Sequence, residues 1–455
     1  MEITFLLNGE TIALGDVNPT MTLLQWLREY RRMTGTKEGC NEGDCGACSV
    51  TVQDADGVKA LNACILFLPQ LNGKAVRTVE GFSADDGTLH PVQDALVRHH
   101  GSQCGFCTPG FVASLVAAHS NQAQDFDDQL AGNLCRCTGY APIIRAAQDA
   151  ATQPVPDWLA DALPEPTAPE TLRMQPESSD ALARVYQQIP EATLVAGATD
   201  VGLWVTKQLR SLNPVIFLGH CQDLKTIEIT ETDMRFGAMV TLQQLRAAIT
   251  EYHPSLGEML RRFASTQIRN AATLGGNIAN GSPIGDCAPA LIALNAQLHL
   301  RKADQRRTLA LEDFFLSYGK QDRTPGEFIE ALSIPRQEDH LKTYKLSKRF
   351  DQDISAVLGA FNITVDDGRV THARIAFGGM AGIPKRAHHV ETSLLGGAWS
   401  EESIAAAWDI WRHDFTPMDD MRASASYRMD MARNMLTRYF LETLGAQTSV
   451  REVQP

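Results

Sequence analysis

The N-terminal region contains the loop Gly39-Cys40-Asn41-Glu42-Gly43-Asp44-Cys45-Gly46-Ala47-Cys48, and Cys64 follows it. A Cys-x4-Cys-x2-Cys spacing is typical of plant-type ferredoxin sites, in which four thiolates hold one [2Fe-2S] cluster. Three thiolates that converge from so short a loop require positive φ angles, which glycine adopts without strain. A four-cysteine zinc site is the alternative, but zinc sites favour paired Cys-x2-Cys motifs. The spacing therefore predicts one cluster held by Cys40, Cys45, Cys48 and Cys64.

A second set of cysteines consists of Cys104-x2-Cys107 and Cys135-x-Cys137. On spacing alone, this set is also compatible with a zinc site or a redox dithiol. Each pair lies just before a predicted helix, at Pro109 and at Pro142. Helix N-termini stabilise negative charge through free N–H groups and the helix dipole. We therefore expect a second [2Fe-2S] cluster where two helices meet.

The sequence around the first set has the pattern of a small β-grasp. Ile3, Phe5 and Leu7 alternate, and Asn8-Gly9 favours a type I′ hairpin turn. Thr20 is expected to cap a helix that carries Leu23, Leu24, Leu27 and Tyr30 and ends at Gly35. Residues 82–152 read as helical, with Pro91, Pro109 and Pro142 at helix starts and with Phe111, Val112, Leu115 and Val116 on one helix face.

The rest of the chain changes pattern twice. Residues 153–179 hold six prolines and several acids with little periodicity, which is typical of a linker. Strands, helices and glycine loops alternate from Ala181, and a hairpin turn is expected at Asp367-Gly368. The glycine loops at 197–202 and 273–282 match neither a P-loop nor a dinucleotide fingerprint. Their small residues suit an anion such as a pyrophosphate, but glycine-rich turns are common in any α/β domain.

Composition excludes several classes of protein. The 455 residues carry a net charge of −13, with 44% apolar and 21% charged residues, so a nucleic-acid or anionic membrane partner is not expected. No apolar run is long enough to span a bilayer, and the N-terminus lacks the pattern of a signal peptide. Clustered cysteines without a signal peptide indicate metal binding in a reducing compartment, so we expect a cytoplasmic protein. Cys221 and Cys287 are expected to be small buried residues.

Several motifs in order resemble one known family. They are EGCNEGDCGAC, GSQCGFCTPG, AGNLCRCTGYAPI, VAGATD, ATLGGNIANGSPIGD and KLSKRFDQDIS. The chain resembles the iron–sulfur and FAD-carrying small subunits of bacterial xanthine dehydrogenases, in the molybdenum hydroxylase family. The resemblance runs nearly end to end. Each motif also recurs among relatives that oxidise other substrates.

The resemblance implies a multidomain α+β fold. It implies a ferredoxin-like β-grasp [2Fe-2S] domain at 1–80, a helical-bundle [2Fe-2S] domain at 81–153, a linker at 154–179, an α+β FAD-binding domain at 180–340 and a C-terminal α+β flavoprotein domain at 341–455. It also implies FAD contacts from Leu194, Val195, Ala196, Gly197, Ala198, Thr199, Asp200, Val201, Thr273, Gly276, Asn277, Asn280, Asp286 and Lys345.

The implied function is electron transfer during the oxidation of hypoxanthine and xanthine to urate. A separate large subunit would carry molybdopterin, in a heterotetramer of two small and two large subunits. Electrons would pass through the Cys104 set, the Cys40 set and FAD to NAD. Gln103 would contact the pterin, and Lys348 and Arg349 would lie near the NAD site. No general acid or base is expected in this chain, because the cofactors perform the chemistry.

Two rival functions stay open at the level of sequence. A related hydroxylase of aldehydes, carbon monoxide or N-heterocycles would carry a similar chain, because specificity lies in the other subunit. A redox sensor or scaffold without turnover would also hold clusters, although sensors rarely need a flavin and two clusters in series. Bound FAD would separate the sensor from the enzyme.

Overall fold

The computed structural model describes residues 2–166 and 174–448, which form two compact units. The first unit takes its described residues from Met1–Gln222, Thr241–Gln243 and Ala264–Thr273. The second takes them from Asp223–Val240, Gln244–Phe263 and Leu274–Pro455. The division therefore does not follow a single cut in the sequence.

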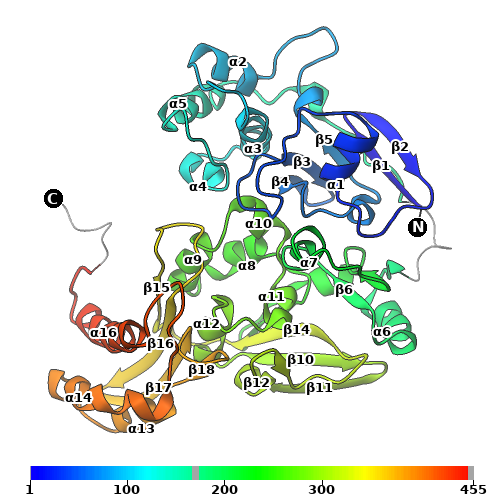
Figure 1. Cartoon of the computed structure of the whole chain (residues 1–455). Helices are drawn as coiled ribbons and strands as arrows, with labels where there is room; N and C mark the ends of the chain where they lie inside the picture. The colour runs from blue at the N-terminus through cyan, green and yellow to red at the C-terminus, as the bar shows by residue number, and fades with distance from the viewer. Residues whose placement is uncertain (1, 167–173, 449–455) are drawn as a thin grey trace. The chain divides into compact units, whose positions relative to one another are not determined.

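The first unit begins with a five-stranded mixed sheet of order β2-β1-β5-β3-β4 (Figure 1). Its strands are β1 (Ile3–Leu7), β2 (Glu10–Leu14), β3 (Ser49–Asp54), β4 (Gly57–Asn62) and β5 (Ala75–Arg77). Only the β1–β5 pair is parallel. Asn8 and Gly9 have φ angles of 52° and 85°, which confirms the predicted type I′ turn. The order and the hairpin are those of the expected β-grasp.

The helix after this hairpin differs from the prediction at both ends. Thr22, not Thr20, accepts the hydrogen bond from the Gln25 amide that caps the helix. The α1 segment (Leu23–Gln25) continues as a π-helical turn (Trp26–Tyr30), so the helical part ends before Gly35. Tyr30 is exposed rather than part of the buried stripe. Sequence periodicity did not distinguish two nearby threonines as candidate caps.

Four helices form the next part of the first unit (Figure 1). They are α2 (Pro91–Arg98), α3 (Thr108–Ser120), α4 (Phe126–Leu130) and α5 (Ala141–Ala150). Proline stands in the first turn of α2, α3 and α5, as predicted. The prediction of one apolar face for α3 was too narrow, because every residue from Gly110 to His119 is buried. The other helices and the sheet surround it.

The remainder of the first unit comes from later in the chain. It includes α6 (Ser179–Gln188), β6 (Thr193–Val195), α7 (Val201–Thr206), β7 (Val215–Phe217) and α10 (Thr266–Ala271), with β6 and β7 parallel. Phe67 and Phe217 meet edge to face at 6.5 Å, in a core shared with Val195. These residues pack onto the ferredoxin-like part rather than forming a separate domain core.

The proline-rich segment is held along the first unit at several points. Arg77 forms an ion pair with Asp161 at 2.7 Å, and Trp158 donates to the Phe82 carbonyl. Gln175 donates to the Pro69 carbonyl at 3.3 Å. Residues 167–173 of the expected linker lie outside the described residues.

The second unit contains a five-stranded antiparallel sheet of order β11-β10-β14-β9-β8. Its strands are β8 (Ile227–Ile229), β9 (Asp233–Gly237), β10 (Gln297–Lys302), β11 (Gln305–Ala310) and β14 (Phe328–Pro335). Three helices and a short hairpin accompany this sheet: α9 (Pro254–Arg261), α11 (Leu274–Asn280), α12 (Cys287–Ala293), and the strands β12 (Phe315–Ser317) and β13 (Lys320–Gln321). The helix α8 (Leu242–Ile249) has its first residues in the first unit and the rest in the second.

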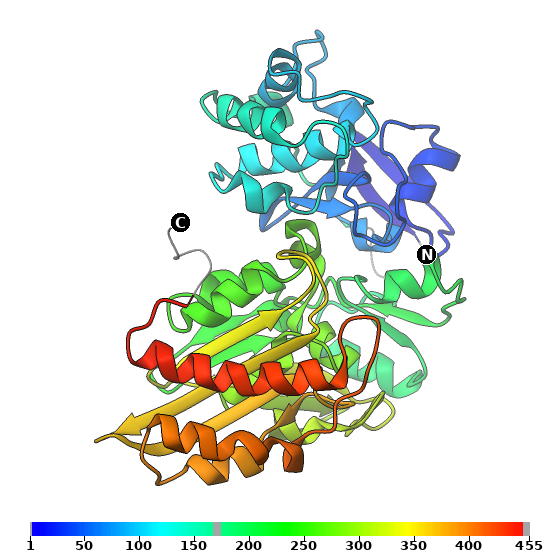
Figure 2. The same ribbon diagram turned by 60° about the vertical axis from the view of Figure 1, so that its left-hand side comes forward.

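A second sheet of this unit has the order β15-β16-β17-β18. It is formed by β15 (Leu341–Leu346), β16 (Val357–Asp366), β17 (Arg369–Gly378) and β18 (Lys385–Arg386). The helices of this part are α13 (His388–Leu394), α14 (Glu401–Ala406), α15 (Trp411–Asp414) and α16 (Ala425–Thr443). Figure 2 shows α16 lying along one face of the sheet. Asp367 and Gly368 form the predicted turn between β16 and β17.

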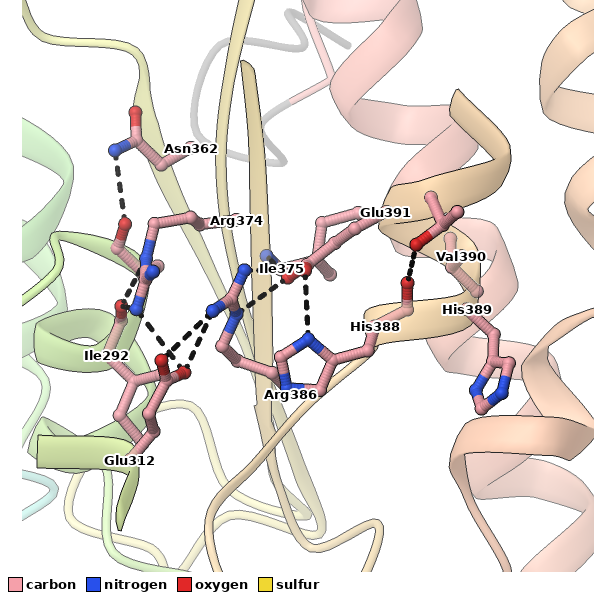
Figure 3. Close-up of polar contacts among 12 residues, drawn as sticks. Ile292, Glu312, Asn362, Arg374, Ile375, Arg386, His388, His389, Val390 and Glu391 are labelled. Atoms are coloured by element: carbon pink, nitrogen blue, oxygen red, sulfur yellow. Dashed lines mark hydrogen bonds and ion pairs between the residues drawn. The ribbon is translucent and has the colours of Figure 1, made fainter. Parts of the chain in front are cut away.

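Partly buried ion pairs join these two parts of the second unit (Figure 3). Glu312 pairs with Arg374 at 3.3 Å and with Arg386 at 3.0 Å. Glu391 pairs with Arg386 at 2.7 Å, and Arg374 donates to the Ile292 carbonyl at 3.0 Å. Removing one partner of such a network leaves an uncompensated buried charge, which makes the junction specific.

No helix within residues 2–166 and 174–448 has both the length and the apolar composition needed to cross a bilayer.

We expect Gly110→Ala to destabilise the first unit. A Cβ atom at this position would lie 2.1 Å from the Gly46 carbonyl oxygen. Overpacking of this kind costs about 1–3 kcal/mol, more than the ~1 kcal/mol that alanine gains over glycine in a helix. Urea unfolding should show a lower midpoint than for wild type. Gly15→Ala is the control, because a Cβ there meets nothing within 4 Å. Equal stability of wild type and Gly110→Ala would contradict the close contact.

Candidate iron–sulfur and flavin sites

The first cysteine set lies on the loop before β3 and at the end of β4. Backbone amides point at its sulfurs: Cys45 N donates to Cys40 Sγ at 3.3 Å, and Cys40 N donates to Cys45 Sγ at 3.4 Å. Positive φ angles at Asn41, Gly43 and Gly46 turn the backbone inward, as the glycine content predicted. Hydrogen bonds to the sulfurs stabilise thiolates and tune the potential of an iron–sulfur cluster.

The four thiols of this set form two pairs. Cys40 contacts Cys45, and Cys48 contacts Cys64, each through a thiol hydrogen bond. The hydrogen bond between Cys40 and Cys45 lowers the pKa of Cys40 to about 5 and raises the pKa of Cys45, so deprotonation of this pair begins at Cys40. Cys48 and Cys64 are buried, which keeps water from this side of the site.

The second set is paired in the same way but lies nearer to solvent. Cys107 contacts Cys135, and Cys137 contacts Cys104. Cys107 directly precedes α3, and burial raises its pKa to about 12 when no metal is bound. Cys104 and Cys137 are exposed. The predicted position of this set at the starts of α3 and α5 agrees with the structure.

Both sets fit a two-iron cluster better than a single ion. Within the described residues, no three side chains of His, Cys, Asp or Glu converge as ligands of one metal ion would. A [2Fe-2S] cluster instead takes two protein ligands on each of its two irons. Two adjacent thiol pairs provide that arrangement. The eight cysteines stay the predicted cluster ligands, and their arrangement in pairs is compatible with that prediction.

A backbone hydrogen bond joins the two sets. The Leu134 amide, next to Cys135, donates to the carbonyl oxygen of Cys45 at 3.0 Å. Asn133 donates from Nδ2 to the Gly46 carbonyl at 3.1 Å. One hydrogen bond and a few covalent bonds thus separate a ligand of the first site from a ligand of the second. Neither Asn133 nor Leu134 was singled out from the sequence, because their role depends on a contact between distant loops.

The first candidate flavin segment, Leu194–Val201, runs from the end of β6 into α7 of the first unit. A Cβ on Gly197 would lie 1.8 Å from the Ala271 carbonyl oxygen, so only glycine fits there. Ala198 has a φ of 61°, which is uncommon for a residue with a side chain. Thr273 belongs to the same unit and forms a β-bridge with Thr241. The tight, strained turn has the character of a ligand-binding loop.

The other candidate flavin residues belong to the second unit. Gly276, Asn277 and Asn280 lie on α11, Asp286 precedes α12, and Lys345 lies on β15.

Asp286 and Lys345 meet in a buried cluster with one further residue. The Lys345 ammonium contacts Asp286 at 2.5 Å and the Ser355 hydroxyl at 3.0 Å, and Ser355 donates to Asp286 at 2.6 Å. All three side chains are buried. Lysine and aspartate are rarely fully buried unless they are paired, as they are here. Ser355 was missed, although it ends the KRFDQDIS motif that carried the resemblance.

The loop that follows Lys345 is tied down from several sides. Arg262 lies over the Phe350 ring at 4.4 Å and donates to the Phe350 carbonyl at 2.7 Å. Lys348 donates to the Met421 carbonyl at 2.7 Å. Arg349 contacts Asp353 at 3.6 Å, and its side chain is 57% exposed. Lys348 and Arg349, the two cations predicted to lie near the NAD site, are both exposed. Gln103, the predicted pterin contact, is exposed beside Cys104.

Models of protein families match four successive segments of the chain. They are a 2Fe-2S iron-sulfur cluster binding domain at 5–68, a [2Fe-2S] binding domain at 78–148, an FAD binding domain in molybdopterin dehydrogenase at 170–337 and a CO dehydrogenase flavoprotein C-terminal domain at 342–443. These matches confirm the predicted multidomain α+β fold, with two 2Fe-2S domains and an FAD-binding domain.

Curated relatives include xanthine dehydrogenases much longer than the matched part. The Calliphora vicina enzyme is 33% identical over 83% of this chain and 34% of its own length. The Gallus gallus xanthine dehydrogenase/oxidase is 30% identical over 96% of this chain and 39% of its own length. The chain thus spans between a third and two fifths of these relatives.

Solved structures of similar fold include two carbon monoxide dehydrogenases. A Cu,Mo-CO dehydrogenase chain has a TM-score of 0.55 and 26% identity, covering 58% of this chain and 94% of that one. A chain of the Hydrogenophaga pseudoflava enzyme has the same TM-score and 27% identity, covering 58% of this chain and 93% of that one. The chain is therefore similar in sequence to xanthine dehydrogenases and similar in structure to chains of carbon monoxide dehydrogenases.

The isolated chain should contain about four irons with matching labile sulfide, because it matches two 2Fe-2S domains and each [2Fe-2S] cluster has two irons. It should also contain one FAD. Iron, sulfide, zinc and flavin would be measured on protein prepared without oxygen. Stoichiometric zinc in place of iron would overturn the cluster assignment, and iron without flavin would overturn the assignment of the flavin loops alone.

Proposed function

Because the chain belongs to the molybdenum hydroxylase family, we propose that it is the electron-transfer part of an NAD-dependent xanthine dehydrogenase. The contact between the two cysteine sets through Leu134 and Cys45 carries this proposal. It joins two one-electron sites by a backbone hydrogen bond of 3.0 Å, in a chain that also has an FAD-binding domain. A redox sensor has no need of this series. The substrates would be hypoxanthine and xanthine, with urate as product.

The Cys104 set is the proposed entry point for electrons. Cys104 and Cys137 are exposed, whereas Cys48 and Cys64 of the other set are buried. Two exposed apolar side chains are close in sequence to this set: Phe106 is 49% and Leu134 45% exposed. Exposed apolar side chains of this kind suit contact with another protein surface. The proposed partner is a molybdopterin-binding large subunit, in a heterotetramer with two copies of each chain.

Residues of this chain would hold both clusters and FAD. The eight cysteines would hold the clusters, and the loop Leu194–Val201 with Thr273, Gly276, Asn277, Asn280, Asp286 and Lys345 would hold FAD. When bound, these groups supply one-electron transfer and hydride transfer to NAD. The chain contributes thiolates, amides aimed at the sulfurs, and a buried Lys345–Asp286 pair whose charge is balanced before any ligand binds.

A carbon monoxide dehydrogenase or another molybdenum hydroxylase is the second candidate, since solved structures of the former share the fold. The native complex, purified from its source, separates these candidates by its activity on xanthine, carbon monoxide, aldehydes and N-heterocycles. We also propose that it works in the cytoplasm, where thiols stay reduced, since none of the ten cysteines forms a disulfide bond.

Cys107→Ser should stop xanthine-driven reduction of NAD by the native complex. Serine is a poor ligand for iron, so the cluster at the entry point should be lost, along with one of two paramagnetic signals. Oxidation of NADH by artificial acceptors at the flavin should survive. Cys287→Ser, at a buried cysteine outside both sets, is the control and should retain both signals. Continued NAD reduction by xanthine without that signal would show that the order of sites is wrong.

Arg349→Glu should raise the KM for NAD while FAD content stays unchanged. Its exposed guanidinium can attract the anionic diphosphate of NAD, and reversing the charge repels it. Electrons should then pass to oxygen, giving more peroxide per xanthine consumed. Steady-state assays with each acceptor measure both effects.

Arg412→Glu provides the matched control for this charge reversal. Arg412 is also exposed and contacts an aspartate at 3.7 Å within its own segment. It should leave the KM for NAD unchanged. Equal effects of both substitutions would mean that net charge matters and Arg349 has no specific role. Turnover with oxygen but not with NAD in the wild-type complex would overturn the dehydrogenase proposal.

A further inference from the structure

A buried polar junction connects three separate parts of the first unit. Gln267 of α10 donates from Nε2 to Asn133 Oδ1 at 2.8 Å and to Ser114 Oγ at 2.9 Å. Ser49, at the start of β3, lies at the limit of bonding distance, 3.5 Å from the same nitrogen. Gln267 and Asn133 are each only 1% exposed. A side chain of α10, which belongs to the matched FAD-binding segment, thus contacts residues that lie between the two cysteine sites.

Gln267 determines which way the Asn133 amide faces. An amide has one acceptor oxygen and one donor nitrogen, so a donor on Oδ1 turns Nδ2 to the other side. Asn133 Nδ2 donates to the Gly46 carbonyl at 3.1 Å. Gly46 lies between Cys45 and Cys48, and the next residue after Asn133, Leu134, donates to the Cys45 carbonyl. The Asn133 amide therefore ties the loop of one site to the loop of the other.

The junction has no space in which to rearrange. A Cβ on Gly46 would lie 2.2 Å from the Gly132 carbonyl oxygen. A Cβ on Gly132 would lie 2.2 Å from Gln267 Oε1 and 2.4 Å from the Ser265 side chain. Interiors packed this closely transmit a displacement instead of absorbing it. A change at Gln267 must therefore move Asn133, and with it the adjoining Leu134 amide.

We propose that Gln267 is a positioning residue that sets the coupling between the two cluster sites. It acts through Asn133, which fixes the position of the neighbouring Leu134 amide and so keeps its hydrogen bond to the Cys45 carbonyl. The inference rests on the proposed function, in which the eight cysteines hold two clusters. It extends that function, because a residue outside both iron–sulfur domains governs how strongly they communicate.

The test uses Gln267→Met, which keeps the side-chain volume and removes the hydrogen bonds. Thr266→Val is the control on the same helix, because the Thr266 hydroxyl donates to the Asp128 carbonyl at 3.1 Å and accepts from Arg269 at 3.0 Å, and neither partner belongs to a cysteine loop. Both variants should keep the full iron and sulfide content. In the fully reduced protein, electron paramagnetic resonance should show spin–spin splitting between the two centres in wild type and in Thr266→Val. That splitting should be reduced or lost in Gln267→Met.

Each of the remaining outcomes contradicts either the role of Gln267 or the proposed function. Unchanged splitting in Gln267→Met, or no splitting in wild type, contradicts the role of Gln267 and leaves the cluster assignment intact. Absence of iron from the wild-type protein contradicts the proposed function instead. Gln267→Glu, which keeps the shape of the side chain, serves if the methionine variant does not fold. If both Gln267 variants lose their iron while Thr266→Val retains it, Gln267 is needed for folding and the inference is wrong.

Discussion

The backbone contact at Gly46 is the constraint on which the iron–sulfur part depends. Its carbonyl oxygen accepts hydrogen bonds from Ser49 and Asn133, and Gly110 of α3 packs directly against it. A side chain at Gly46 would clash with Gly132 and Asn133, one at Gly110 would clash with Gly46, and one at Gly132 would clash with Gln267 and Ser265. The absence of side chains at these three positions therefore serves proximity more than flexibility.

The second unit depends on a different kind of interaction, namely buried charge. Lys345, Asp286 and Ser355 form one closed group, and Glu312 with its arginine partners forms another. Neither group is strongly stabilising by itself, because removing charges from water costs nearly as much as their pairing returns. Their value lies in geometry: each charge is satisfied in one arrangement only. Such an arrangement keeps α12 fixed against β15 and β17, on which the candidate flavin residues depend.

Sequence predicted most of what is local in this chain. Cysteine spacing indicated both sites, Asn8-Gly9 indicated the first hairpin, and proline positions indicated three helix starts. Each of these signals acts within a few residues, where the covalent chain itself fixes the geometry. The cap at Thr22 was missed because two threonines offer the same chemistry two residues apart. Gln267, Asn133 and Ser355 could not be predicted, because their partners lie between 10 and 218 residues away along the chain.

The first unit includes α10, and this has a consequence for how the protein is made. Chains emerge from the ribosome from the N-terminus, and early domains usually fold before later ones are finished. Here the iron–sulfur region lacks Gln267 until residues beyond 270 have been synthesised. For that interval, the contacts from Gln267 to Asn133 and Ser114 are missing beside the cysteine sites. That interval would leave the thiols accessible to the machinery that delivers iron and sulfide. Once α10 is synthesised, Gln267 would form its hydrogen bonds between the two cysteine loops.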